Sequence, residues 1–265
     1  MTHVLSVGWN RTVIELKQYI REKESVFFSF SFPILLLLLF ATIFGAQFTG
    51  DPQMNAARFF LPGMIAAGVL LTSFQTMAMS VALERDDGTL KRLRATPMPP
   101  IAYFIGKVGL VLITSVAQVA VLLAVARFGY DVHLPTDATS WLTFAWIFFL
   151  GVVGGVVLGI AWSSLASARS AGAVVIAPML VLQFISGVYF SFSSTPQWLQ
   201  QIAAIFPLKW IAQGMRGVFY PDSMAHLEMA GSWEFGRTAL VLAAWAVGGL
   251  VLCLTTFKWF KRGTV

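Results

Sequence analysis

The chain has 265 residues, of which 57% are hydrophobic and 11% are charged, and its formal net charge is +6. Soluble domains carry about 25% charged residues, so this composition excludes an ordinary soluble enzyme, a disordered protein and a coiled coil. So few positive charges could not cover a nucleic-acid-binding face. They suit a membrane protein whose Lys and Arg residues gather on the cytoplasmic side. Cys253 is the single cysteine, which excludes an internal disulfide and a cysteine metal cluster.

The first 25 residues are predicted to contain a cytoplasmic amphipathic helix. Within 9–24 the apolar residues recur at helical spacing, while Arg11, Glu15 and other polar residues occupy the remaining faces. The apolar stripe consists of Trp9, Val13, Leu16 and Ile20. A helix with one apolar stripe and a charged remainder lies in the membrane interface. We therefore expect this helix on the inner surface of the membrane.

Six segments are apolar over about 20 residues, the length that a helix needs to cross a bilayer. They are about 26–48, 59–83, 105–126, 141–165, 172–192 and 238–257. None has an ionisable residue at its centre, and Lys107 stands near one end of the third, from where it can snorkel to the interface. A proton-driven transporter usually needs an ionisable group inside the membrane, so we expect the energy to come from elsewhere.

The distribution of charges predicts the orientation. With the N-terminus inside, 13 of the 18 basic residues but only six of the 12 acidic residues lie on the inner side. Basic residues concentrate in cytoplasmic loops, so both termini are expected in the cytoplasm and the chain in the plasma (inner) membrane. Residues 1–265 are expected to form one domain. In the fourth span, Gly151, Gly155 and Gly159 predict close packing within the subunit.

The loop between the second and third spans is the most informative stretch. It reads Glu84-Arg-Asp-Asp-Gly-Thr-Leu-Lys-Arg-Leu-Arg-Ala-Thr-Pro97. We expect a short cytoplasmic helix with acids at its start and basic residues at its end, an ion pair between Asp87 and Lys91, and two exposed leucines, Leu90 and Leu93. A topology anchor would explain the basic residues alone. A docking element for a soluble partner explains the whole pattern.

The long outer segment 193–236 contains two apolar runs that are too short to cross the membrane. Pro207 separates the first, Trp198–Phe206, from the second, Leu208–Phe219, and we expect a re-entrant or interfacial hairpin. The predicted fold is therefore all-α. It is a polytopic membrane protein with six transmembrane helices, an N-terminal interfacial helix, a short cytoplasmic helix and a re-entrant outer helical hairpin.

Motifs for catalysis and metal binding are missing from the sequence. Gly45 and Gly50 have the glycine spacing of a phosphate-binding P-loop, but Asp51 stands where the lysine should be. The three histidines are scattered, and a metal site needs several convergent ligands. We expect no catalytic residue, no metal site and no bound cofactor in this chain.

Two sets of residues resemble the permease subunits of type-2 ABC exporters of the daunorubicin-resistance kind. The first set is Glu84, Gly88 to Arg94, Thr96-Pro97 and Gly106-Lys107. The second set follows the fifth span and consists of Ser186-Gly187, Pro196-Gln-Trp-Leu, Pro207-Leu208 and Arg216. With the six spans and the amphipathic N-terminus, the resemblance covers nearly the whole chain.

The resemblance implies two permease subunits, as a homodimer or a heterodimer, and two ABC ATPase subunits that bind ATP and Mg. It implies that the helix after the second span receives the ATPase motion and that the turn Ser167–Ser170 makes a second, smaller contact. The coupling residues would be Glu84, Arg85, Asp87, Gly88, Thr89, Leu90, Lys91, Arg92, Leu93 and Arg94. Spans two and five would line the substrate path, with Phe74, Gln75, Gln183, Phe184 and Tyr189 as candidate lining residues.

We therefore expect the membrane-spanning half of an ATP-driven exporter of amphiphilic compounds such as drugs, antibiotics or lipids. It would work by alternating access, in contact with membrane lipid and without nucleic acid. The alternative is an integral membrane protein that needs no ATPase, such as a lipid-modifying enzyme, a channel or a scaffold. A channel would need a polar or charged ring in its pore, and none of the spans offers one.

Overall fold

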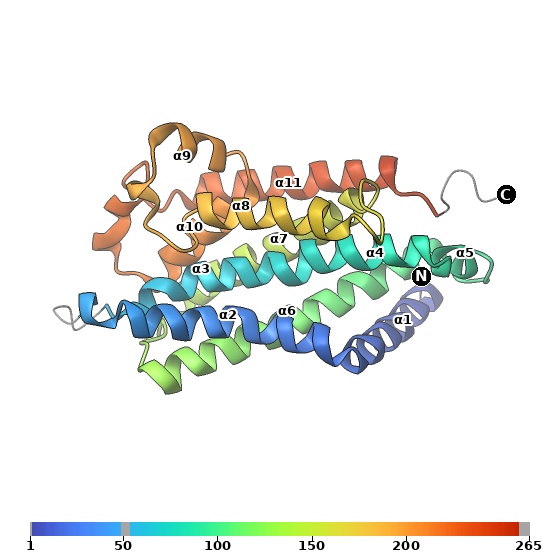
Figure 1. Ribbon diagram of the computed structural model, residues 1–265, viewed down its shortest axis with the longest axis horizontal. Coiled ribbons are helices and arrows are strands. Elements are labelled where there is room, and N and C mark those ends of the chain that lie inside the picture. The colour runs from blue at the N-terminus through green and yellow to red at the C-terminus, as the bar shows by residue number, and fades with distance from the viewer. Residues whose placement is uncertain (1, 49–53, 260–265) are drawn as a thin grey trace.

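The computed structural model describes residues 2–48 and 54–259, and every regular element in those ranges is helical (Figure 1). This confirms the predicted all-α class. Gly50, Asp51, Lys261 and Arg262, which entered the motif and charge arguments above, lie outside the described residues.

Five helical stretches in the described part of the chain are long and apolar enough to cross a membrane. They are α2 (Lys23–Ile43), the continuous stretch Ala56–Asp86, α6 (Pro100–Tyr130), α7 (Ala138–Trp162) and α11 (Phe235–Thr256). The stretch Ala56–Asp86 consists of α3 (Ala56–Leu70), a π-helical turn η2 (Leu71–Gln75) and α4 (Thr76–Asp86). These stretches match five of the six predicted spans, with ends shifted by one to five residues.

The remaining predicted span, 172–192, is shorter than expected. It begins with a second π-helical turn, η3 (Gly172–Ile176), and continues as α8 (Ala177–Ile185). Gly187 then adopts a positive φ of 71°, in the left-handed region that commonly terminates helices. The chain therefore leaves the helix seven residues before the predicted end, and this helix falls below the length of the other five.

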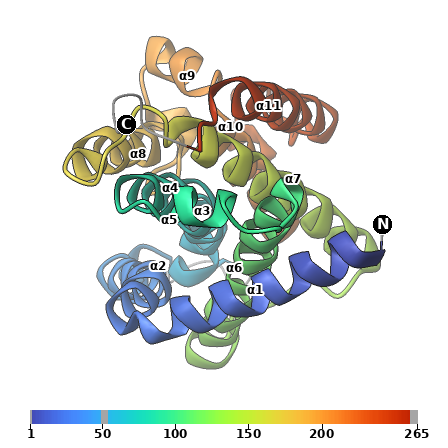
Figure 2. The ribbon, with the colours of Figure 1, turned by 90° about the vertical axis from the view of Figure 1, so that its right-hand side faces the viewer.

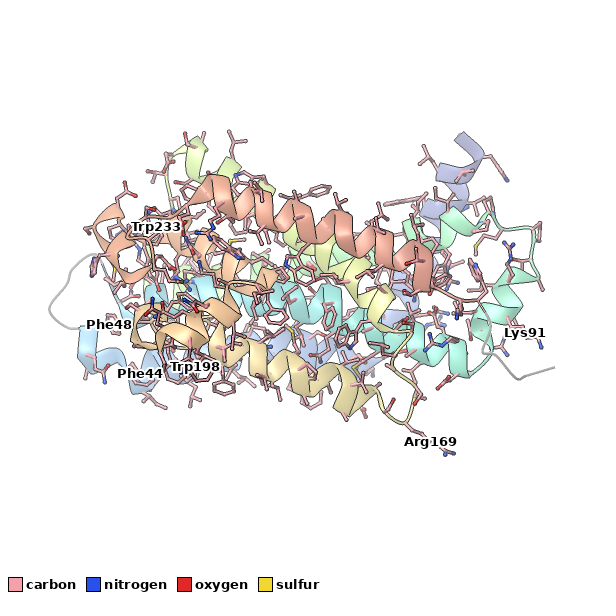
Figure 3. The ribbon with its side chains drawn as sticks, turned by 90° about the horizontal axis from the view of Figure 1, so that it is seen from above. Phe44, Phe48, Lys91, Arg169, Trp198 and Trp233 are labelled. Carbon is pink, nitrogen blue, oxygen red and sulfur yellow. The ribbon has the colours of Figure 1, made fainter. Side chains whose placement is uncertain are left out.

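Short elements gather at the two ends of the helical bundle. The helix α5 (Thr89–Arg94) and the turn after α7 lie at one end, where Figure 3 shows Lys91 and Arg169. The opposite end holds the short 3₁₀ helices η1 (Gly45–Phe48), η4 (Phe192–Ser194) and η5 (Asp222–Leu227), together with α9 (Gln197–Ala203). Figure 3 shows Phe48, Trp198 and Trp233 at that end. The segments predicted on opposite sides of the membrane thus lie at opposite ends.

The helix α10 (Pro207–Phe219) is the second half of the predicted outer hairpin, and it packs into the bundle. It contacts α3, α7 and α11, and all residues from Leu208 to Arg216 are buried. Pro207 is its first residue, where the missing backbone N–H is tolerated. α9 remains on the outside, with Trp198 and Ile202 exposed. The core therefore centres on α3, α7 and α10.

The glycine repeat of α7 packs against the second predicted span, as expected. A Cβ on Gly155 would overlap the Ser73 hydroxyl, and a Cβ on Gly159 would meet the backbone carbonyl of Phe74 at 2.5 Å. Only glycine allows these backbones to approach so closely. The close packing predicted for the glycines of the fourth span is confirmed, because α7 packs tightly against η2.

Candidate coupling site and cavity

The N-terminal helix α1 (Thr2–Arg21) crosses α6 at a close distance (Figure 2). Gly106 and Gly109 of α6 face α1, and a Cβ on them would overlap the side chains of Arg11 and Thr12. The Thr12 hydroxyl donates a hydrogen bond to the carbonyl oxygen of Gly8, 3.1 Å away. These glycines allow the polar face of α1 to reach the residue after Gly106, which is Lys107.

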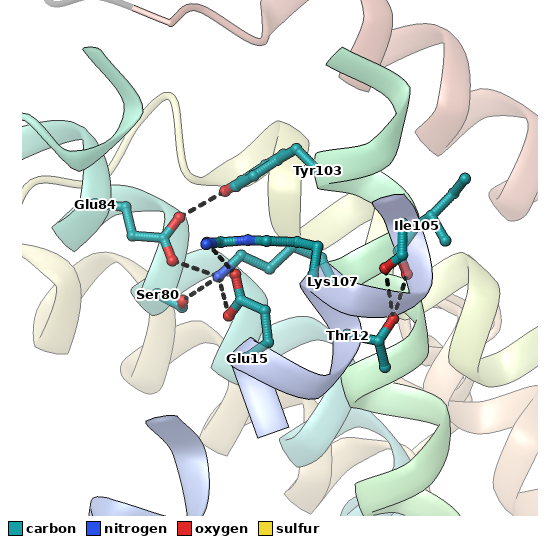
Figure 4. Close-up of polar contacts among 9 residues, drawn as sticks. Thr12, Glu15, Ser80, Glu84, Tyr103, Ile105 and Lys107 are labelled. Carbon is teal, nitrogen blue, oxygen red and sulfur yellow. Dashed lines mark hydrogen bonds and ion pairs between the residues drawn. The ribbon is translucent and has the colours of Figure 1, made fainter. Parts of the chain in front are cut away.

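Lys107 lies at the centre of a cluster of charged and polar side chains (Figure 4). Its ammonium group is 2.5 Å from Glu84 Oε1, 3.0 Å from Glu15 Oε2 and 3.0 Å from the Ser80 hydroxyl. The Tyr103 hydroxyl donates a hydrogen bond of 2.8 Å to the other oxygen of Glu84. The cluster joins three elements, because Glu15 comes from α1, Ser80 and Glu84 from α4, and Tyr103 and Lys107 from α6.

The cluster pairs its charges. Arg11 forms an ion pair with Glu15, so two cations face two carboxylates. Lys107 is fully buried, whereas snorkelling to the interface was predicted, because its pairing partners lie inside the protein. The Glu84 side chain is 16% exposed and is paired with Lys107. Removing one charge from such a pair leaves the others buried and uncompensated, which is costly.

The apolar stripe of α1 is exposed at its two ends and half-buried at Val13 and Leu16, and Leu16 packs against the main hydrophobic core. Trp9 and Ile20 are 62% and 60% exposed, while Arg11 and Glu15 on the opposite side are buried against α6. The exposed ends of the stripe suit contact with lipid, whereas its middle is partly covered by the protein. The same helix is bound to the bundle through its polar face.

The corner between α4 and α5 differs in part from the prediction. α4 runs to Asp86, so the acids stand at the end of one helix and not at the start of the next. Gly88 adopts a φ of 77° and turns the chain, and the Asp87 carboxylate accepts a hydrogen bond from the backbone N–H of Thr89 at 2.8 Å. The predicted ion pair between Asp87 and Lys91 is not among the ion pairs of the described residues.

The expectation of two exposed leucines on α5 is wrong. Leu90 is fully buried in the main hydrophobic core, and Leu93 is half-buried against it. The turn at Gly88 directs this face of α5 back onto the bundle. Lys91, Arg92 and Arg94 are exposed, and the Arg94 guanidinium lies 5.7 Å from the centre of the Trp259 ring. The exposed surface of α5 is therefore cationic.

The turn after α7 is fastened to the end of α4. The Arg85 guanidinium donates hydrogen bonds to the carbonyl oxygens of Ser163 and Ala166, at 2.5 and 2.6 Å. The Asp86 carboxylate accepts a hydrogen bond from the backbone N–H of Ala168 at 2.7 Å. The two segments predicted to contact an ATPase, α5 and Ser167–Ser170, are thus joined through Arg85 and Asp86.

A cavity of about 640 Å³ opens between α1, α2, α4 and α8. Glu15, Ser80 and Glu84 of the charged cluster form part of its wall, together with Glu22 and Glu24 from the junction of α1 and α2. Apolar side chains of α2, α4 and α8 line much of the remainder; among them are Phe28, Phe32, Met79, Leu83 and Leu180. Its volume falls within the range of about 300–1,000 Å³ that is typical of sites for small molecules.

Two of the five candidate path residues line this cavity. Gln75 of the second predicted span and Gln183 of the fifth belong to its wall. Tyr189 is buried and donates a hydrogen bond to Gln183, so it supports the wall from behind. Phe184 is 54% exposed and contacts the Tyr189 ring, and Phe74 packs edge-on against Trp162.

A second buried ion pair lies at the opposite end of the bundle. Arg216 of α10 is 2.5 Å from Glu228 and donates a hydrogen bond of 2.8 Å to the carbonyl oxygen of Gly187. Nearby, Lys209 is buried, and its ammonium lies 3.7 Å from the centre of the Trp210 ring. Burial lowers the pKa of Lys209 to about 8. The contacts of Arg216 join α10 to the segments on either side of it.

Sequence reasoning missed Glu15, Ser80 and Tyr103 as members of the cluster. A usable signal was present, since Lys107 and Tyr103 share a face of α6 at a spacing of four residues. The side chains of Glu15 and Ser80 come from other elements, and only the packing of α1 and α4 on α6 brings them together.

Known proteins resemble this chain over most of its length. A family model described as ABC-2 type transporter matches residues 9–220. The chain is 25% identical over 184 residues to the "Probable multidrug ABC transporter permease YbhR" of Escherichia coli, covering 69% of this chain and 49% of YbhR. It is 25% identical over 203 residues to ABC transporter G family member 20 of Dictyostelium discoideum, covering 75% of this chain and 26% of that protein.

A third relative is matched over most of its length. YvfS of Bacillus subtilis, whose name describes a transport permease, is 22% identical over 206 residues, which are 77% of this chain and 81% of YvfS. The chain spans about half the length of YbhR and about a quarter of the Dictyostelium protein. Since the family model covers most of its residues, the chain belongs to the ABC-2 type transporter family, the family of membrane permeases that its motifs predict.

Proposed function

We propose that this chain is the membrane-spanning permease of an ATP-driven exporter of amphiphilic compounds, and that separate ATPase subunits bind ATP and Mg and hydrolyse the ATP. One observation carries the proposal. Glu15, Ser80 and Glu84 belong both to the charged cluster and to the cavity wall. These side chains connect the α4–α5 corner with the space that could hold a substrate.

The proposed mechanism is alternating access. The cationic surface of α5 docks on an acidic surface of the ATPase, and ATP binding moves α5 together with the turn after α7. Because Arg85 and Asp86 join these segments, they move as one unit with the end of α4. Glu84 lies on the same helix, so the motion changes its position relative to Lys107 and Glu15 and reshapes the cavity.

The proposed assembly has two permease subunits, identical or related, and two ATPase subunits. It lies in the plasma (inner) membrane with both termini and α5 in the cytoplasm. A cysteine in 86–95 should then be labelled only from the cytoplasm and one in 221–232 only from outside, in a Cys253→Ser background. Labelling of both segments from the same side would contradict this orientation.

The function is tested by reconstitution. The chain is co-expressed with an ATPase encoded beside it, and the complex is placed in vesicles with ATP outside. Uptake of a fluorescent amphiphile that requires ATP and both proteins is the expected result. Lys107→Gln should reduce ATP-driven uptake, whereas Lys258→Gln, which alters an exposed lysine, should not.

The alternative, a membrane protein that needs no ATPase, makes the opposite prediction. Transport or lipid modification by the purified chain without ATP would support it and would overturn the proposal. The purified chain alone should neither bind nor hydrolyse ATP, because its sequence has no Gly-Lys-Ser/Thr motif.

A further inference from the structure

A proline interrupts the backbone hydrogen bonding of α2. Pro33 is buried inside this helix and has no backbone N–H, so the carbonyl oxygen of Ser29, four residues earlier, loses its intrahelical donor. Within a bilayer, a backbone group that a proline frees is commonly paired by a neighbouring helix. Here the neighbour is α6, where Gln118 Nε2 donates a hydrogen bond of 2.6 Å to the Ser29 carbonyl.

The Gln118 amide depends on this contact. Its side chain is 1% exposed, and its Oε1 has no hydrogen-bond partner among the described residues. Gly68 of α3 makes room for the amide, because a Cβ on Gly68 would lie 3.0 Å from Gln118 Oε1. If the contact broke, the Gln118 amide and the Ser29 carbonyl would both lose their partner in an apolar surrounding, which is unfavourable. The hydrogen bond therefore holds α2 against α6.

The two halves of α2 pack differently against the bundle. In the half before the proline, residues 23–32, Ser29 is buried and the other residues are exposed or half-buried. In the half after the proline, Leu37 is fully buried in the main hydrophobic core, and the Phe40 ring lies 4.9 Å from the ring of Phe60 on α3. The first half therefore relies on the hydrogen bond to α6 more than the second half does.

Every residue of α2 that lines the cavity between α1, α2, α4 and α8 belongs to the first half. These residues are Glu24, Ser25, Phe28, Ser29 and Phe32. Because α1 ends at Arg21 and α2 begins at Lys23, a displacement of α1 passes directly to this half. Sharp bends in helices occur mostly at prolines. A bend at Pro33 would therefore move this wall of the cavity and leave the second half of α2 in place.

From these contacts we infer that residues 23–32 form a gate on the cavity, that Pro33 is its hinge, and that Gln118 is the positioning residue that holds it closed. Breaking the hydrogen bond between Gln118 and Ser29 releases the gate, and the cavity then opens toward the surrounding lipid. The inference rests on the proposed function for what enters the cavity. The movement itself belongs to this chain and needs no ATPase.

The movement is measured as a distance between two nitroxide labels on the full chain in lipid nanodiscs, by pulsed electron paramagnetic resonance. In a Cys253→Ser background, one label replaces Lys23 at the start of the gate and the other replaces Arg169 in the turn after α7. Both positions are exposed. The ten residues before Pro33 form a lever of about 15 Å. A bend of about 20°, the onset of a sharp kink, therefore displaces its far end by about 5 Å.

Variants of the hydrogen bond test the roles of Gln118 and Pro33. Gln118→Leu removes the donor and should add a population with a distance about 5 Å longer. Gly68→Ala, which crowds the Gln118 amide, should add the same population. Pro33→Ala restores the backbone N–H that pairs the Ser29 carbonyl within α2, so the combination with Gln118→Leu should return the distance to its original value. A general loss of packing at Gln118 would not be rescued in this way.

Two controls separate a hinged movement from general loosening. A label at Leu39, an exposed position in the half of α2 after the proline, should keep its distance from Arg169 in every variant. Thr114→Val removes a buried hydroxyl one turn earlier on α6, whose hydrogen bonds of 2.9 and 3.2 Å go to carbonyls of its own helix. This variant should leave both distances unchanged.

An unchanged distance between Lys23 and Arg169 in Gln118→Leu would overturn the inference. A longer distance that persists with Pro33→Ala, or that appears equally at Leu39, would overturn it as well. These results leave the proposed function intact if the complex still takes up an amphiphile with ATP. Conversely, a hinge that responds as expected in a chain whose complex does not transport would uphold the gate and reject the exporter.

Discussion

Replacement of Lys107 by methionine tests the energetic role of the charged cluster. The substitution keeps the apolar part of the side chain and removes the charge that pairs with Glu15 and Glu84. Removing one partner of a buried ion pair costs about 3–5 kcal/mol, chiefly because the remaining charge stays buried. Both carboxylates line the cavity, where water reaches them, so we expect the lower end of this range, about 3 kcal/mol.

The measurement is unfolding of the purified chain in mixed micelles by increasing SDS, followed by tryptophan fluorescence. Arg237→Gln is the matched control, because Arg237 pairs with Glu234 at 3.1 Å but its side chain is 64% exposed. Exposed pairs contribute about 0–1 kcal/mol. The double variant Lys107→Met, Glu84→Gln should lose less stability than the sum of the single variants, by about 1–3 kcal/mol. Losses of unfolding free energy that are additive in the double variant would refute the reasoning. A loss for Lys107→Met that is no larger than the loss for Arg237→Gln would also refute it.

Three further predictions concern other parts of the molecule. Lys91→Glu combined with Arg92→Glu should abolish ATPase binding in a pull-down and leave the thermal midpoint unchanged, because both side chains are exposed; retained binding would reject α5 as the docking surface. Gly159→Ala should destabilise the chain by about 1–3 kcal/mol, since the added Cβ meets a backbone carbonyl. Gly154→Ala, whose nearest neighbour would be 3.8 Å away, should be neutral, and equal midpoints for the two variants would contradict the packing argument. Burial lowers the pKa of Lys209 from 10.5 to about 8, so the unfolded chain binds more protons between these values and stability should rise with pH across that range. Lys209→Met should reduce this rise, and an unchanged pH profile of the thermal midpoint would count against it.

The long helices were predictable because membrane spans depend on local composition. Runs of about 20 apolar residues located five of them to within five residues. The length of the helix that ends at Ile185 was overestimated, although a glycine at position 187 is a residue type that commonly ends helices. The apolar run continues from Val188 to Phe190, so hydropathy alone does not show that the backbone leaves the helix at Gly187.

The candidate site was predictable only where its residues are close in sequence. The stretch from Glu84 to Arg94 was recognised as a unit, and Gly106-Lys107 was recognised as part of the same motif. The burial of Leu90 depends on how Gly88 orients α5 against the rest of the bundle, which spacing along one helix does not reveal. Glu15 joins the cluster through contacts 92 residues apart in sequence, so its role depends on the tertiary packing of α1 on α6.

The π-helical turn η2 holds one residue more than an ordinary α-helical turn between α3 and α4. The Thr76 hydroxyl donates to the carbonyl of Leu71, five residues earlier, within this wider turn. Each residue of an α-helix advances the chain by about 100° around its axis. The wider turn accommodates one additional residue, so deleting one residue from Leu71–Gln75 would convert it to an ordinary α-helical turn and leave α3 and α4 in their present orientation, with Glu84 still facing Lys107. A relative with a one-residue alignment gap here can therefore keep the same acid and the same lysine in contact, with an ordinary α-helix in place of the wider turn.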